Sequence, residues 1–380
     1  MAGCQYVNTA GETVFANNGL TDAGVNGFSK VDLGKMMSGK IVSVRPRVGG
    51  ITEEISGSST PKDFEELFQL THLYFTALNK DEKAFASYIN KQKAFIGNML
   101  SSPQFYFQDQ YSKFVYGANP RYSGFPTPDK LDQANYDLAY QKYKERFANA
   151  GDFNFYFVGN IDENKIKEYS EKYLANLPST GKEETYNTTD FRPLSGSHTK
   201  IVEKGTDPKS SVRIVYQGET TYDAKEDYAL SSLGEILTIK LIEKLREEEG
   251  GVYGVGARGN INKIPYGWYS FSISFPCGPE NVEKLKNAAI AEVEKIVANG
   301  PTEEDLAKVK EAQLLERKED LKENRFWLRL LKNADYEDKD VNKVLEYEKT
   351  VTNLSKSDIQ NVAKKYLTNG YILGIHNPEK

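Results

Sequence analysis

The order of predicted elements repeats once along the 380-residue chain, and this repeat limits the possible folds more than any other feature. The clearest internal match pairs "YQKYKERFANAGDFNFYFVGNI" (140–161) with "VAKKYLTNGYILGIHNP" (362–378), each read as a helix followed by a strand. Such self-similarity indicates two copies of one structural unit. Between the copies, residues 177–199 are polar and rich in Ser, Thr, Gly and Pro, which is typical of a linker.

The second half carries the clearer periodic patterns. The β-branched segment 211–219 predicts a strand, and 227–246 predicts a helix. The apolar face of that helix would be Leu230, Leu233, Leu237 and Leu241. Strict alternation of aromatic or apolar residues with serine over 267–275 predicts a half-buried strand. Further helices are expected at 282–299, from a Thr302 cap to about 333, and at 354–367, with a last strand at 370–376.

The first half repeats this order with weaker signals. Residues 8–39 are expected to be helical with breaks, and the start of the chain, 1–19, is read as a helix. Two strands are expected within 40–58, and a helix follows with Thr60 as its N-cap and Pro61 at its first position. The remaining expected elements are helices at 81–99 and 135–147 and a closing strand at 153–161.

Two copies of strand–helix–strand–strand–helix–helix–helix–strand predict an α+β protein of two tandem homologous domains. Each domain is expected to have a mostly antiparallel sheet with helices packed on one face. The expected bounds are 1–180 for the first repeat, 181–199 for the linker and 200–380 for the second repeat. No strand is predicted before the helix at 1–19, so the first repeat is expected to lack its N-terminal strand, as in a chain cut from a longer protein.

Composition narrows the possible functions. The net charge of -5 and the pI of 5.6 argue against a nucleic-acid partner, because protein surfaces that bind nucleic acids are basic. No run approaches the roughly 18 apolar residues of a membrane span. Cys4 and Cys277 are too few for a disulfide framework or a zinc site of cysteine ligands. The three histidines, His72, His198 and His376, are far apart, and neither H-E-x-x-H nor H-x-x-E-H occurs, so no metal site is predicted in this chain.

The segment "LREEEGGVYGVGARGN" (245–260) contains G-x-G-x-x-G at 254–259, which spells a dinucleotide-binding fingerprint. That fingerprint needs a strand before the glycines and a helix after them. Here a predicted helix comes first and a strand follows, so the dinucleotide interpretation is excluded. Gly250 and Gly251 fit a helix C-cap instead, and Arg246 is a cation that suits a helix C-terminus.

The same segment resembles part of the insulinase/pitrilysin metallopeptidases, the family with an inverted zinc motif. Members carry an arginine and, seven residues later, a tyrosine in a segment of the form L-R-x(n)-G-x-x-Y. Here "KLREEEGGVYGVGA" supplies Arg246 and Tyr253. The segments 27–48, 56–77 and 143–162 look like the third domain of bacterial members. The resemblance covers nearly the whole chain and implies a fold like that of the mitochondrial processing peptidase.

The resemblance implies that this chain is the C-terminal, non-catalytic half of a two-half zinc endopeptidase. Arg246 would hold the substrate backbone with its guanidinium fork, and Tyr253 would donate its phenol to the scissile carbonyl in the assembled enzyme. The zinc and the general-base glutamate would come from an N-terminal half, on the same polypeptide or in a partner subunit, since neither repeat has the zinc motif. The two halves would enclose a peptide substrate, and the bacterial relatives favour the cell envelope or periplasm as its location.

A second interpretation uses the same fold for a different task. The chain would be a scaffold or peptide-binding protein from which catalysis has been lost altogether. An H-x-x-E-H half in the same polypeptide, or in a separate partner, would distinguish the two interpretations. A free-standing enzyme is the weakest possibility, because the sequence offers no constellation of nucleophile, base or metal ligands.

Overall fold

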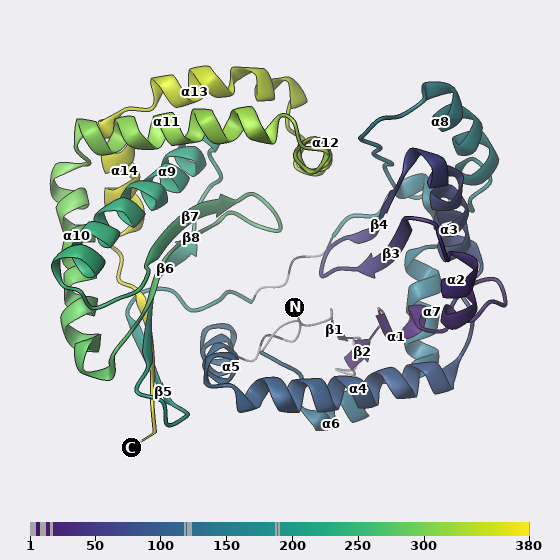
Figure 1. Cartoon of the computed structure of the whole chain (residues 1–380), viewed down its shortest axis with the longest axis horizontal. Helices are drawn as coiled ribbons and strands as arrows, with labels where there is room; N and C mark the ends of the chain where they lie inside the picture. The colour runs from purple at the N-terminus through teal and green to yellow at the C-terminus, as the bar shows by residue number, and fades with distance from the viewer. Residues whose placement is uncertain are drawn as a thin grey trace. The chain divides into compact units, whose positions relative to one another are not determined.

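The structure is a computed structural model that describes residues 5–7, 13–15, 18–117, 119, 124–186, 188 and 191–379. Its contacts divide the chain into two compact units (Figure 1). The first comprises Met1–Leu100 and Ala118–Thr189, and the second comprises Ser101–Gly117 and Asp190–Lys380. Cys4 lies outside the described residues.

The second unit is built on a five-stranded sheet with the order β5-β9-β6-β8-β7. Its strands are β5 (His198–Glu203), β6 (Ser210–Glu219), β7 (Gly256–Asn262), β8 (Trp268–Cys277) and β9 (Ile372–Asn377). Only β5 and β9 run parallel, and the other neighbours pair antiparallel. The predicted strands at 211–219, 267–275 and 370–376 are therefore confirmed, with ends that differ by a few residues.

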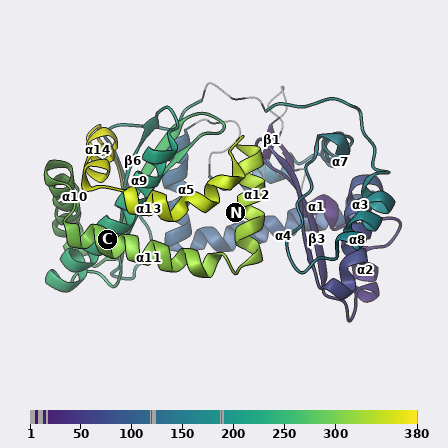
Figure 2. The same cartoon turned by 90° about the horizontal axis from the view of Figure 1, so that it is seen from above.

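Helices cover one face of this sheet. They are α9 (Ala224–Leu241), α10 (Val282–Asn299), α11 (Glu303–Asp320), α12 (Asn324–Tyr336), α13 (Tyr347–Asn353) and α14 (Lys356–Tyr366). Figure 1 shows α9, α10 and α14 beside the sheet, and Figures 1 and 2 both show α11 and α13 side by side. The leucines predicted on one face of α9 are all fully buried, against Phe271 and Ile273 of β8 among others. This packing confirms the predicted α+β class.

A single helix, α5 (Pro103–Tyr116), packs against β5 and β9 of this sheet (Figure 1). Phe107, Tyr111 and Val115 of α5 form a separate apolar cluster with Val202, Val215 and Ile372. A Cβ atom at Gly374 in β9 would lie 2.7 Å from the Tyr111 ring, so a glycine there lets the helix approach. Residues 101–117 thus fold with the second unit, although they precede the linker in sequence.

The first unit is mainly helical. Its strands are the antiparallel pairs β1 (Gln5–Val7) with β2 (Thr13–Phe15) and β3 (Val42–Val48) with β4 (Glu53–Ser59). Its helices are α1 (Asn18–Thr21), α2 (Lys30–Met36), α3 (Phe64–Thr76), α4 (Glu82–Ser101), α6 (Pro128–Asp132), α7 (Tyr136–Arg146) and α8 (Glu163–Tyr169). Helix α3 packs on β3 and β4 (Figure 2).

Two predicted helix starts are confirmed at atomic detail. The Thr60 hydroxyl accepts a hydrogen bond from the Asp63 backbone N–H at 3.3 Å, at the turn Pro61–Asp63 that leads into α3. The Thr302 hydroxyl accepts from the Asp305 backbone N–H at 3.0 Å at the start of α11. Both caps satisfy amides that a helix leaves without intrahelical partners.

Three predictions are wrong. The helix expected over residues 1–19 is replaced at Gln5–Val7 and Thr13–Phe15 by the pair β1–β2, in which Tyr6 lies opposite Val14, and among its described residues only the last two are helical, in α1. Aromatic and β-branched residues such as these favour strands. The single helix expected up to about 333 breaks after Asp320. There the Trp327 indole N–H donates to the Leu321 carbonyl at 2.9 Å, and this carbonyl would accept an intrahelical bond in a continuous helix.

The third error concerns the closing strand of the first repeat. Residues 153–158 lie outside the strands of the described structure. Their aromatic side chains pack on α3 instead: the Phe157 ring stacks on Phe68 with centroids 5.0 Å apart, and Phe153 meets Phe75 edge-on at 5.0 Å. The alternating aromatic residues therefore mark a segment that packs on a helix and not a strand of a sheet.

Candidate functional site

The candidate site begins where α9 ends. After Leu241 the helix widens over Ile242–Glu248, and the Glu249 N–H bonds the Lys244 carbonyl five residues back at 3.1 Å. Turns of this π-type are rare and often occur at functional sites. Leu245 is fully buried and fixes the turn to the core, whereas Arg246 next to it is exposed.

Two glycines then stop the helix, as predicted. Gly250 has a φ of +62°, a conformation that side chains with a Cβ rarely adopt. The Gly251 N–H bonds the Leu245 carbonyl at 3.1 Å, which closes the helix end in the manner of a Schellman motif. A Cβ atom at Gly251 would lie 2.7 Å from the Leu285 side chain of α10, so this position also needs glycine for packing.

Beyond the glycines, adjacent side chains point in opposite directions. Val252 is only 7% exposed and belongs to the main core of the second unit. Tyr253 is 97% exposed. Within the part of the chain that the structure describes, Arg246 makes no ion pair, and Tyr253 makes no hydrogen bond or ring contact. Both candidate side chains are therefore presented to solvent from a turn whose neighbours are anchored.

The last glycine of the dinucleotide-like motif, Gly259, has a packing role. A Cβ atom at Gly259 in β7 would lie 2.5 Å from the Leu230 carbonyl oxygen of α9. On the helix side, a Cβ atom at Gly234 would lie 2.9 Å from the Arg258 Cα. Helix α9 thus crosses β7 at a distance that only two glycines permit. The observed order, helix α9 and then strand β7, agrees with the exclusion of a dinucleotide loop.

Side chains of α9 also close the outer edge of β7. The Thr238 hydroxyl accepts from the Ala257 N–H at 2.9 Å, and the Asp227 carboxylate accepts from the Ile261 N–H at 2.7 Å. Burial is the main cause that raises the pKa of Asp227 above its ordinary value, although the bond from Ile261 opposes it. Sequence analysis missed Asp227 and Thr238, because nothing in a helical pattern shows which strand edge a helix will cover.

A second polar cluster lies between α9 and α11. Gln313 is buried; its amide N–H donates to Ser232 at 3.0 Å and to Glu235 at 2.9 Å, and its oxygen accepts from the Tyr228 hydroxyl at 2.5 Å. Burial raises the pKa of Glu235. Ser232 and Glu235 have the spacing of the first histidine and the glutamate of H-x-x-E-H, but Ile236 follows. The described residues contain no group of three or more His, Cys, Asp or Glu that could hold a metal ion.

The histidines and the described cysteine are engaged in structural roles. Each imidazole lies at hydrogen-bonding distance from a backbone carbonyl: His72 from Tyr173 at 2.7 Å, His198 from Ser195 at 3.1 Å and His376 from Lys204 at 2.8 Å. Burial raises the pKa of the Cys277 thiol to about 11, so the reactive thiolate is disfavoured.

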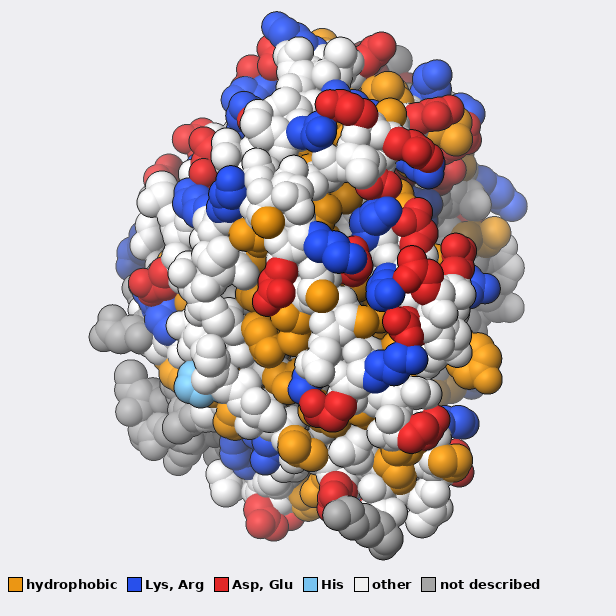
Figure 3. Space-filling model, turned by 90° about the vertical axis from the view of Figure 1, so that its left-hand side faces the viewer, with side chains coloured by type: hydrophobic (Ala, Val, Ile, Leu, Met, Phe, Trp, Pro, Cys, Tyr) orange, Lys and Arg blue, Asp and Glu red, His pale blue; other side chains and the backbone are white. Residues whose placement is uncertain are grey.

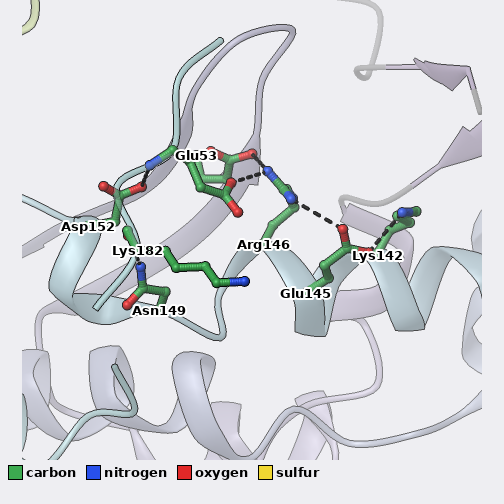
Figure 4. A network of polar contacts seen from close by, with 8 residues as sticks. Glu53, Lys142, Glu145, Arg146, Asn149, Asp152 and Lys182 are labelled. Carbon is green, nitrogen blue, oxygen red and sulfur yellow. Dashed lines mark hydrogen bonds and ion pairs between the residues drawn. The ribbon is translucent and has the colours of Figure 1, made fainter. Parts of the chain in front are cut away.

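In the first unit, a polar network holds the chain that follows α8 (Figure 4). Arg146 at the end of α7 pairs with Glu184 at 2.6 Å and lies 3.8 Å from Glu53 of β4. The Asn149 amide donates to the Lys182 carbonyl at 2.6 Å. The start of the linker is thus attached to the first unit. The charged side chains of the network pair with one another.

One face of the second unit carries charges of both signs. On the side that carries α10 and α14, Lys and Arg alternate with Asp and Glu, with apolar side chains between them (Figure 3). Several of these charges are paired, such as Lys295 with Glu292 at 2.6 Å and Lys365 with Glu226 at 2.7 Å. Among the described helices, none combines the length and the apolar character needed to cross a membrane.

The sequence of this chain is similar to sequences of known proteins. Residues 137–313 match the family model described as the peptidase M16 inactive domain. The chain is 24% identical over 294 residues to the probable zinc protease PqqL of Haemophilus influenzae, an alignment that covers 76% of this chain and 31% of that protein. This chain spans about a third of the length of the curated relatives that it matches.

Two solved structures show the same fold. The periplasmic protease PqqL from Escherichia coli superposes with a TM-score of 0.80 at 19% identity, over 95% of this chain and 40% of that one. The first half of the same protease superposes with a TM-score of 0.71 at 13% identity, over 94% of this chain and 81% of that one. The fold seen here therefore occurs in the first half of that protease as well.

Proposed function

We propose that the chain is the substrate-binding, non-catalytic half of a zinc endopeptidase, because residues 137–313 match the model of the peptidase M16 inactive domain and the chain is similar in sequence to probable zinc proteases. The observation that carries this proposal is the presentation of Arg246 and Tyr253. Both side chains are exposed, without polar partners among the described residues, next to a turn whose Leu245 and Val252 are buried. A surface residue held in this way is available to a ligand.

Arg246 would bind the peptide backbone. Its guanidinium has five N–H donors in a planar fork, which suits two carbonyl oxygens of an extended peptide. Binding of the peptide carbonyl oxygens breaks no ion pair of Arg246, because Arg246 has no acidic partner among the described residues. This role makes Arg246 a binding residue that should affect KM more than kcat.

Tyr253 would act on the scissile carbonyl. Its phenol would donate a hydrogen bond to the carbonyl oxygen as negative charge develops there. One such donor typically contributes about 2.7–4 kcal/mol to the transition state, so its loss should lower kcat by a hundredfold or more, in order of magnitude. The interaction strengthens only as the oxyanion forms, and therefore Tyr253 should affect kcat far more than KM.

Zinc would be held outside this chain. Zinc supplies a Lewis acid and lowers the pKa of its bound water, and it needs about three protein ligands. The described residues offer no such set, so the ligands and the general base would belong to a zinc-bearing N-terminal half. The peptide would be enclosed between the two halves. Since the Escherichia coli protein of this fold is described as periplasmic, we place the enzyme in the bacterial cell envelope.

The test is cleavage of a quenched fluorescent peptide by this chain alone, by the zinc-bearing half alone, and by the two together. Activity on mixing, absent from either part, is the expected result. The mixture with Tyr253→Phe should lose a hundredfold or more in kcat, in order of magnitude, with KM little changed. Tyr186→Phe, which changes an exposed tyrosine in the linker, is the matched control.

Other results would redirect the proposal. If the mixture does not cleave the peptide although the zinc-bearing half is folded and metal-loaded, the scaffold or peptide-binding interpretation is favoured. Cleavage by this chain alone that a chelator abolishes would contradict the placement of the metal. An unchanged kcat in Tyr253→Phe would remove Tyr253 from the reaction.

A further inference from the structure

We propose that Glu249 is a positioning residue for Tyr253, and that it acts through its ion pair with Lys284 of α10. The inference rests on the proposed function of Tyr253 and adds a residue to it. Glu249 itself would not touch the substrate. It would fix the start of the turn from which the Tyr253 phenol is presented.

The contacts of Glu249 connect two helices. One carboxylate oxygen, Oε2, lies 2.6 Å from Lys284 Nζ in the first turn of α10, and the other, Oε1, lies 3.2 Å from Lys244 Nζ in the widened turn Ile242–Glu248 that follows α9. The carboxylate is thus clamped between two ammonium groups from different elements. The hydrogen bond from Lys284 and, after it, the one from Lys244 lower the pKa of Glu249, so the carboxylate stays charged at pH values below the usual glutamate range.

The turn has few other restraints between this clamp and β7. Within the described structure, the backbone hydrogen bonds of the turn end with the one from the Gly251 N–H to the Leu245 carbonyl, and β7 begins only at Gly256. Gly250 and Gly254 flank the turn, and glycine gives the backbone the largest conformational freedom. Among the described residues, the turn meets α10 through the buried Val252 side chain and the packing of Gly251 on Leu285, and the Glu249–Lys284 pair adds an ion pair with the same helix.

Stability alone does not account for this pair. The side chain of Lys284 is 60% exposed and that of Glu249 is 20% exposed, and an ion pair that solvent reaches from one side in this way contributes little to folding. The reaction rate is more sensitive than the stability to the position of a side chain, because a displacement of about 1 Å at a reacting group can lower the rate by about a hundredfold. A pair that contributes little to the fold can therefore contribute measurably to the placement of a phenol only four residues away.

The test is a double-mutant cycle in the reconstituted enzyme, with peptide cleavage as the readout. Glu249→Gln should lower kcat by about tenfold and leave KM within about twofold. Lys284→Met should have the same effect, and Lys284→Arg should restore most of the rate. In a Tyr253→Phe background, Glu249→Gln should have no further effect on kcat, because the group that it positions is already gone.

The control is Glu304→Gln, which removes an ion pair of similar length, 2.7 Å, between Glu304 and Lys308 on α11. It should leave kcat and hydrogen exchange at 252–255 unchanged. In the isolated chain, Glu249→Gln should speed amide exchange over those residues without changing the melting temperature. This second readout needs no partner half.

The outcomes separate the two claims. If Glu249→Gln lowers kcat by the same factor with and without the Tyr253 hydroxyl, Glu249 does not act through Tyr253 and the inference is overturned. An unchanged kcat in Glu249→Gln, with Tyr253→Phe impaired, would overturn it equally while leaving the proposed function intact. If Tyr253→Phe is as active as the parent, the proposed function fails first.

Discussion

Tyr111 of α5 has a buried phenol oxygen with no hydrogen-bond partner among the described residues. Burial raises the pKa of this phenol, and the Arg213 guanidinium lies 5.3 Å from its ring centroid. A buried hydroxyl without a partner costs about 1–3 kcal/mol, whereas the ring contacts would persist in phenylalanine. The hydroxyl is therefore expected to work against the stability of the fold.

Tyr111→Phe should raise the free energy of unfolding by about 1 kcal/mol, measured by urea denaturation. The matched control is Tyr143→Phe in α7, because the Tyr143 hydroxyl is buried but donates to the Tyr74 carbonyl at 2.9 Å. That change should lower stability by about 1 kcal/mol. A loss of stability in Tyr111→Phe would show that the hydroxyl does have a partner.

Glu235 gives a pH-dependent prediction. Burial raises its pKa above the ordinary 4.5, so the folded state binds a proton more tightly than the unfolded state. Ionised Glu235 therefore destabilises the fold at neutral pH, and this penalty disappears as the pH falls through the raised pKa toward 4.5. The amide oxygen of glutamine could still accept the bond from Gln313.

Glu235→Gln should accordingly raise the melting temperature at neutral pH, and the gain should shrink as the buffer is made more acidic. Glu311→Gln, at an exposed position of α11, serves as the control and should give a difference that stays small across the same range. A gain in Glu235→Gln that did not change with pH would contradict the assignment of the effect to ionisation.

Among the elements, α9 crosses β7 at close range. A Cβ atom at Gly259 would lie 2.5 Å from the Leu230 oxygen and 2.7 Å from the Phe271 ring. Gly259→Ala should therefore lower the free energy of unfolding by about 1–3 kcal/mol, as overpacked cores do. Gly256→Ala in the same strand, where a Cβ atom would meet nothing within 4 Å, should be close to neutral. Equal effects of the two would contradict a specific close approach.

The elements also show what periodicity can predict. The apolar face of α9 and the alternation of β8 could be predicted from the sequence, because each element buries one face and the apolar residues on that face recur with the period of its backbone. Residues 153–158 alternate as well, but their partner is the aromatic face of α3, and a period of two does not say whether a sheet or a helix lies beneath. The break after Asp320 depends on one indole and left no glycine or proline as a signal.

The candidate site was predicted only in part. Arg246 and Tyr253 were found through the spacing of a family motif, and the helix end that carries them is confirmed. Their exposure could not be predicted from the motif, because its spacing does not say which side chains face solvent. The clamp of Glu249 by Lys284 joins residues of two helices, and only the packing of α10 against the end of α9 brings them together.

For the whole molecule, the path of the chain between the units has a practical meaning. The chain builds part of the first unit, contributes α5 to the second, returns to the first, and enters the second again after the linker. A gene cut at the linker would thus yield a C-terminal fragment without the helix that covers Val202, Val215 and Ile372. Anyone who exchanges halves between homologues, or expresses the second unit by itself, would have to carry residues 101–117 along as a separate piece.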